Sequence, residues 1–205
     1  MKPFGKAVLL AIAIVLAPGL DWSFVTRTPP RTWHYPSAFF YISTFIPPEF
    51  EPAIDEAATT WNAAGAAWFF TPASFAIDAQ YGVRDGLSVI DYTTPSDPTI
   101  PGETSVFTSG DDAEIVEVDT ALNPSLPLST GFDPNSYDVQ SVSTHELGHW
   151  LELLHSQNPG DVMFERIDKG QIKRDLSSDD IEGIQFLYPP AVETVKRVAG
   201  KPVTR

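Results

Sequence analysis

Apolar residues recur with a period of about two along residues 33–46, for example at Phe40, Ile42 and Ile46. Such alternation predicts a β-strand with one buried face. We expect the strand to end at Pro47, because proline lacks the backbone N–H that a sheet ladder needs.

A longer period begins at Glu49. Residues 49–64 carry apolar side chains three and four positions apart, and the acidic residues lie in the first half, where they favour the helix dipole. This spacing predicts an amphipathic helix that ends at Gly65. Its buried stripe would consist of Phe50, Ile54, Ala57, Ala58 and Trp61.

Three further runs have the composition and alternation of strands, at residues 67–70, 87–92 and 114–120. Elsewhere between residues 91 and 133 the chain is mostly Pro, Gly, Ser, Thr and Asp, which are typical of loops. We therefore expect no other regular element in that stretch.

The last predicted helix lies within residues 176–188 and is capped by Ser177 or Ser178. Apolar residues at helical spacing give it one buried face. These residues are Ile181, Ile184, Leu187 and Tyr188.

The first twenty residues have the pattern of a signal peptide. Lys2 and Lys6 precede an apolar run over residues 7–17, and Pro18 and Gly19 follow it. The run is short for a membrane span, so an uncleaved anchor is the weaker alternative. We expect a secreted protein.

Composition narrows the classes of protein further. A chain of 205 residues that is 42% hydrophobic can form one well-buried domain, and with no cysteine it must do so without disulfides. The net charge of −14 argues against nucleic acid and stable membrane association, because both partners are usually anionic. The expected division is a signal peptide at 1–20, a spacer at 21–32, one folded domain at 33–190 and a flexible tail at 191–205.

Three of the four histidines lie within residues 145–155. In a helix, His145 and His149 project from one face, where two imidazoles can bind one metal ion. Glu146 points close to the same side and can act as a general base on a water. This is the H-E-x-x-H pattern of zinc proteases.

His155 would point away from that metal if the helix continued, so we expect the chain to leave the helix first. Three imidazoles with an open fourth position are typical of catalytic rather than structural zinc. The alternative is a surface helix that carries two histidines by chance. The third histidine makes that coincidence improbable, and we expect about one zinc per chain.

Residues 145–155, HELGHWLELLH, resemble the long motif of the metzincins, which a methionine turn follows. The nearer resemblance is to the matrixins, because Ser156 follows the third histidine and Met163 lies a short loop later. Residues 176–188 are similar to the C-terminal helix of that branch, and residues 137–142 to its lead-in to the motif.

The resemblance implies an α+β, metzincin-like fold with a twisted, mostly parallel mixed sheet of about four to five strands, two long helices and a C-terminal helix. Residues 114–120 would be the edge strand of the cleft, where an extended peptide can pair. The implied protein is a monomeric zinc metalloendopeptidase that acts on peptides or proteins, including those of extracellular matrix. His145, His149 and His155 would bind zinc, Glu146 would be the base, and Met163 would pack beneath the metal.

One residue departs from the motif: Glu152 stands where the family has glycine. A side chain in the left-handed conformation costs about 1 to 2 kcal/mol, less than the roughly 10 kcal/mol of a well-formed zinc site. Zinc binding should therefore survive this strain, whereas the placement of His155 should be affected by it. We expect Glu152→Gly to relieve the strain and tighten the placement of His155. Two alternatives remain: an impaired zinc-bound peptide-binding module, and a hydrolase of small molecules.

Acidic residues in the loops raise the question of calcium. Their spacing matches no calcium-binding loop, so we expect solvated loops, with a calcium site as the alternative. The residues concerned are Asp97, Glu103, Asp111 and Asp112.

Overall fold

The computed structural model describes residues 24–73, 76–110 and 114–190. The expected signal peptide and tail lie outside these residues. Within them, no helix has both the length and the apolar character needed to cross a membrane.

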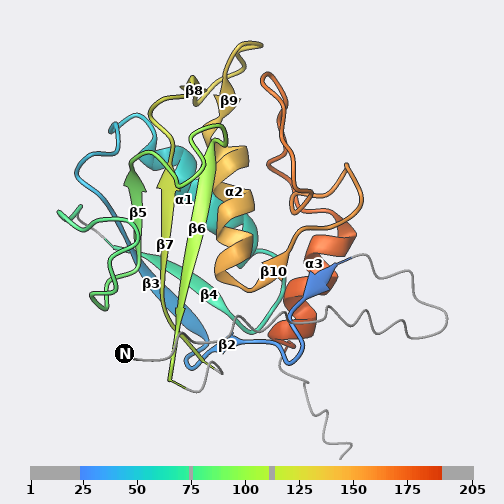
Figure 1. Cartoon of the computed structure of the whole chain (residues 1–205). Coiled ribbons are helices and arrows are strands. Elements are labelled where there is room, and N and C mark those ends of the chain that lie inside the picture. Colours follow the sequence, from blue (N-terminus) through green and yellow to red (C-terminus); the bar gives the residue numbers. More distant parts are fainter. Residues whose placement is uncertain (1–23, 74–75, 111–113, 191–205) are drawn as a thin grey trace, which may run out of the picture.

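A twisted, mostly parallel sheet forms one side of the domain (Figure 1). Its main strands have the order β4-β3-β5-β7-β6, the short β2 also pairs with β7, and β6 alone is antiparallel. The strands are β2 (Thr32–Trp33), β3 (Ser37–Ile42), β4 (Phe69–Pro72), β5 (Val89–Tyr92), β6 (Gly102–Thr108) and β7 (Glu114–Leu122). The structure thus confirms the predicted mixed sheet.

The edge strand beside the motif helix is β6, so the prediction that residues 114–120 form this edge was wrong. Those residues belong to β7, which pairs with β5 on one side and β6 on the other. The sequence of β6, GETSVFT, contains a glycine and three hydroxyl residues, which resemble a loop. Its pairing with β7 overrides that weak local preference.

In the residues that the structure describes, three helices complete the fold (Figure 1). They are α1 (Glu51–Asn62), α2 (Val139–Trp150) and α3 (Ser178–Leu187), close to the predicted positions. Trp61 of α1 donates its indole N–H to the carbonyl of Thr144 on α2, at 2.7 Å, which fixes the two helices together. Ser177 and Asp180 form a capping box at the start of α3, as the sequence indicated for the cap.

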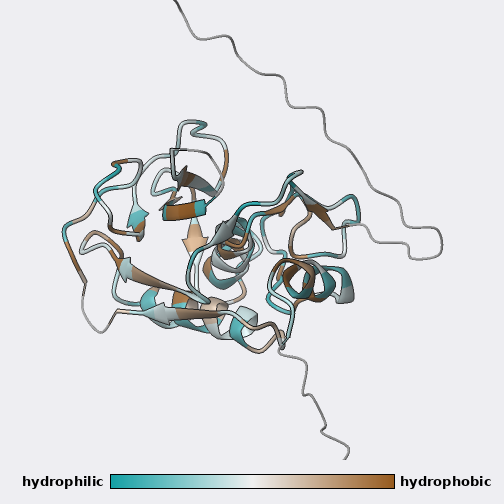
Figure 2. Cartoon of the chain, turned by 90° about the horizontal axis from the view of Figure 1, so that it is seen from below, coloured by the Kyte–Doolittle hydropathy of each residue, from teal (hydrophilic) through white to brown (hydrophobic). Residues whose placement is uncertain are grey.

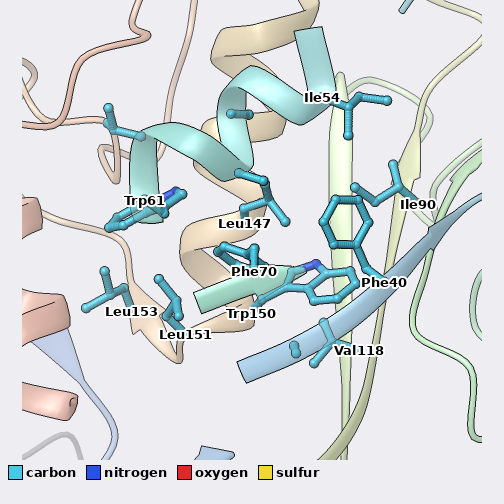
Figure 3. Close-up of a cluster of buried hydrophobic side chains, with 14 of the residues drawn as sticks. Phe40, Ile54, Trp61, Phe70, Ile90, Val118, Leu147, Trp150, Leu151 and Leu153 are labelled. Carbon is cyan, nitrogen blue, oxygen red and sulfur yellow. The ribbon is translucent and has the colours of Figure 1, made fainter. Parts of the chain in front are cut away.

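The core lies between the sheet and the helices (Figure 3). Trp150 of α2 meets Phe40 of β3 and Phe70 of β4 edge to face, with ring centroids 5.9 and 6.1 Å apart. Burial of each such side chain contributes about 1.5 to 3 kcal/mol. Seen from below, the helix ribbons carry both apolar and polar residues (Figure 2).

Two small sheets lie outside the main one. β8 (Leu128–Ser129) pairs with β9 (Tyr137–Asp138) just before α2. β1 (Val25–Thr26), within the expected spacer, pairs antiparallel with β10 (Leu153–Leu154). The start of the described chain therefore packs against the segment that leads to His155.

Candidate metal centre and catalytic cleft

Helix α2 begins at a well-held cap. The carboxylate of Asp138 accepts hydrogen bonds from the backbone N–H of Ser141 at 2.9 Å and from Arg174. Burial by itself would raise the pKa of Asp138, but these hydrogen bonds lower it below its usual value. The charged cap satisfies a backbone donor at the helix N-terminus, so the helix that carries the motif starts at a defined residue.

The three motif histidines converge. Nε2 of His149 lies 3.2 Å from Nε2 of His145 and 3.2 Å from Nε2 of His155. Four-coordinate zinc with Zn–N bonds of about 2.0 to 2.1 Å separates two of its nitrogen ligands by roughly 3.3 Å. The spacing therefore fits a zinc ion.

Backbone carbonyls set the proton positions on two of these rings. Nδ1 of His145 lies 2.8 Å from the carbonyl oxygen of Val162, and Nδ1 of His149 lies 2.8 Å from that of Leu153. A carbonyl only accepts, so each Nδ1 carries the proton and each Nε2 keeps its lone pair for a metal.

Desolvation lowers the pKa of all three rings, which favours the neutral form, although His155 is the exposed member of the group. Burial lowers the pKa of His145 to about 4 and that of His149 well below 6.5, while His155 shows a smaller lowering from the same cause. A neutral imidazole is the form that binds a metal. The site is thus arranged as a metal centre.

The chain leaves α2 at Leu151, and Glu152 makes the turn toward His155. Glu152 has φ of 66°, and it is the one residue other than glycine with positive φ in the described parts of the chain. The backbone thus has the left-handed conformation expected at the position of the family glycine.

The Glu152 side chain is buried, with 3% of its area exposed. Its carboxylate lies 3.1 Å from Nε of Arg27 and 3.8 Å from Nη1 of Arg31, both in the N-terminal segment that contains β1. These ion pairs act with the β1–β10 pairing to hold the turn. Glu152 therefore has a structural role that glycine lacks.

The methionine turn closes the site from beneath. Asp180 of α3 accepts hydrogen bonds from the backbone N–H groups of Val162 and Met163, at 2.9 and 3.1 Å. A Cβ atom at Gly148 would lie 2.2 Å from Sδ of Met163, so the methionine occupies the space that glycine leaves on α2. Met163 is therefore buried against the helix that carries His145 and His149.

Glu146 lies beside the histidines with 5% of its area exposed. Thr104 of β6 donates a hydrogen bond to its Oε2 at 2.7 Å. Burial raises the pKa of Glu146 to about 7, although the bond from Thr104 acts in the opposite direction. A carboxylate with a pKa near neutral is suited to general-base catalysis.

The histidines and Glu146 line a cleft of about 740 Å³. β6 borders one side, and the loop that carries Phe164, Ile167 and Lys173 borders the other. Sequence reasoning did not identify Thr104, Arg27 or Arg31, because each acts through a contact that is distant along the chain.

The structure gives the acidic loop residues other contacts. Asp97 accepts hydrogen bonds from Thr99, and Glu103 accepts them from Ser96 and Tyr81. Among the described residues, the histidine cluster is the one group that brings three potential metal-ligand atoms within 4.8 Å of one another. Asp111 and Asp112 lie outside the described residues.

Several curated proteins are similar to part of this chain. Metalloendoproteinase 2-MMP of Arabidopsis thaliana is 49% identical over 51 residues, which are 25% of this chain and 14% of that protein. Stromelysin-2 of Rattus norvegicus is 40% identical over 79 residues, 35% of this chain and 17% of its own length. Interstitial collagenase of Sus scrofa is 43% identical over 61 residues, 29% and 13% respectively. Each match thus spans less than a fifth of the relative.

The family comparison covers far more of the chain. The model of the peptidase family described as matrixin matches residues 46–189, which include α1, the three histidines and α3. This match spans more than half of the sequence and agrees with the observed mixed sheet and three helices. The chain therefore belongs to the matrixin family.

Proposed function

We propose that this protein is a secreted zinc-dependent metalloendopeptidase that uses His145, His149 and His155 as metal ligands and Glu146 as the general base. The observation that carries the proposal is the convergence of three imidazole Nε2 atoms at zinc spacing, with a buried carboxylate on the same helix. A bound zinc would supply Lewis acidity that polarises a carbonyl and makes water nucleophilic near neutral pH.

Glu146 would move the protons of the reaction. Its carboxylate would take a proton from the attacking water and pass it to the leaving amine as the peptide bond breaks. The raised pKa of about 7 allows the same group to hold that proton between the two events.

The substrate would lie along β6 as an extended peptide. One edge of β6 pairs with β7, and Gly102, Glu103, Thr104 and Val106 of β6 line the cleft. Backbone pairing at such an edge gives affinity without strict sequence preference. Peptides and proteins are therefore the proposed substrates, in accord with the metalloendoproteinases that the chain resembles. Secretion rests on the expected signal peptide alone.

The alternative of an impaired binding module assumed a misplaced His155. Nε2 of His155 instead lies 3.2 Å from Nε2 of His149, the same distance as Nε2 of His145. This geometry gives the alternative no support.

The test compares the wild-type protein with Glu146→Gln and Glu146→Ala. We expect about one zinc per chain in all three proteins by metal analysis, and cleavage of a random peptide library by the wild type alone. Loss of the base should lower kcat by about 100-fold or more. A Gln variant that cleaves at the wild-type rate, or an Ala variant that loses its zinc, would contradict the role given to Glu146.

A further inference from the structure

A chain of hydrogen-bonded side chains leads from the core to the carboxylate of Glu146. The indole N–H of Trp150 donates to Oγ1 of Thr120 at 2.8 Å, and the hydroxyls of Thr120 and Thr104 lie 2.8 Å apart. Thr104 then donates to Oε2 of Glu146 at 2.7 Å. Both ends belong to α2, and the two threonines come from the adjacent strands β7 and β6.

The direction of this chain follows from its first member. An indole N–H can only donate, so Thr120 is the acceptor of that bond. An ionised Glu146 can only accept, so Thr104 then gives its single hydroxyl proton to Glu146 and Thr120 donates to Thr104. Every donor therefore points toward the carboxylate.

Burial keeps water from replacing the bond between Trp150 and Thr120. Thr120 is 1% exposed and Trp150 is fully buried. A buried polar group that loses its partner costs about 1 to 3 kcal/mol, so the hydroxyl of Thr120 has little freedom to turn away. Thr104 is only partly buried and lines the cleft, so its hydroxyl is held by its bonds to Thr120 and Glu146 rather than by burial.

The backbone of β6 confines the same carboxylate from a second direction. A Cβ atom at Gly102 would lie 2.7 Å from Oε1 and 2.9 Å from Cγ of Glu146. The glycine thus lets the strand pass directly against the glutamate side chain. One oxygen is held by a hydroxyl while the rest of the group contacts the strand.

We propose that Thr104 is a positioning residue for Glu146, and that Thr120 and Trp150 hold its hydroxyl toward the carboxylate. The inference rests on the proposed role of Glu146 as the base. Thr104 acts through Glu146, since a general base must be held within hydrogen-bond reach of the proton it abstracts.

The first experiment measures zinc-loaded Thr104→Val, which keeps the shape of the side chain but removes the hydroxyl. We expect kcat to fall about 10-fold, with KM within about twofold of the wild type and the zinc content unchanged. Thr104→Ser should restore most of the rate because it restores the donor. The matched control is Ser105→Ala, which removes the neighbouring hydroxyl that donates to Tyr81 instead.

A second readout needs neither metal nor activity. In zinc-free protein, Thr104→Val should lower the urea midpoint of unfolding more in the wild-type background than in Glu146→Ala, because the bond to the carboxylate is already absent from the latter. Equal shifts in the two backgrounds would show that the two side chains do not interact and would overturn the proposal.

The remaining outcomes separate this inference from the proposed function. Wild-type activity in Glu146→Gln would overturn both. If Glu146→Gln is inactive and Thr104→Val keeps the wild-type kcat, the positioning role alone fails. A higher KM with an unchanged kcat would also overturn it, because Thr104 would then act by contact with the substrate.

Discussion

The two parts of the metal site are held in different ways. His145, Glu146 and His149 stand on α2, whose regular backbone and charged cap determine where they point. His155 instead follows a turn that contains a left-handed Glu152 and depends on contacts with Arg27 and Arg31. The helix positions its residues by local geometry, whereas the turn is supported by the distant N-terminal segment that contains Arg27 and Arg31.

The two parts of the motif should therefore differ in how strongly they respond to substitutions elsewhere in the protein. Local geometry needs few outside contacts, so the helical part should tolerate change in the rest of the protein. The turn combines about 1 to 2 kcal/mol of backbone cost with a buried charge, so its conformation requires the arginines that face it.

The largest effect should come from removal of a ligand on either side of this division. We expect His149→Ala and His155→Ala each to weaken zinc binding about 100-fold or more, since a site worth roughly 10 kcal/mol is divided among three histidines. Competition with a chelator of known affinity measures this directly. His34→Ala is the control, because His34 pairs with Glu114 at the surface. Wild-type affinity in His155→Ala would mean that the turn supplies no ligand.

Glu152 is where the two parts are best compared. We expect Glu152→Gln, which keeps the strained backbone but removes the charge, to lower the free energy of unfolding by about 1 to 2 kcal/mol; Arg27 is partly exposed, so solvent screens part of the loss. Zinc affinity should fall about 3- to 10-fold through His155. Urea unfolding of zinc-free protein and chelator competition provide the two measurements.

Glu152→Gly tests the expectation drawn from sequence alone. Glycine relieves the backbone cost, but it also loses both ion pairs and gains flexibility in the unfolded chain, worth about 0.5 to 1 kcal/mol. With the ion pairs included, we now expect this variant to be no more stable than the wild type and to bind zinc no better. Tighter zinc binding than the wild type would show that strain outweighs the arginine contacts.

The smallest predicted effect is a difference in the pH at which the imidazoles of His145, His149 and His155 become protonated. The pKa of His145 lies near 4 and that of His149 well below 6.5, whereas burial lowers His155 less strongly. As pH falls, His155 on the turn should therefore protonate before His145 on the helix, which imidazole NMR signals of zinc-free protein can follow.

The same pKa values have a consequence for stability. The unfolded chain binds more protons than the folded chain below pH 6.5, so the histidines make the free energy of unfolding decrease as pH falls from about 6.5 toward 4. Protonation of His145 ahead of His155 would contradict the described difference in burial.

Sequence predicted the helical part well. The four-residue spacing of His145 and His149 requires only a helix, and the apolar stripes of α1 and α3 reflect a period that any packed helix shares. The turn was anticipated because His155 is out of phase with that helix.

The rest depended on contacts between distant segments. Nothing near Glu152 in the sequence indicates Arg27 or Arg31, because a charge pair more than a hundred residues apart has no periodic signal. Thr104 was missed for the same reason, since its strand gains regularity only by pairing with β7. Local sequence patterns predict helices and strands, whereas the contacts between those helices and strands depend on the packing of the whole domain.

The bonds from the methionine turn to Asp180 offer a way to follow the assembly of the whole site. The amide hydrogens of Val162 and Met163 are buried against a carboxylate that belongs to α3. In hydrogen–deuterium exchange, they can exchange only when α3 separates from the turn or the domain unfolds. Protection of these two amides therefore reports whether α3 is packed against the methionine turn. If they exchange only as fast as the whole domain unfolds, α3 and the metal site unfold together.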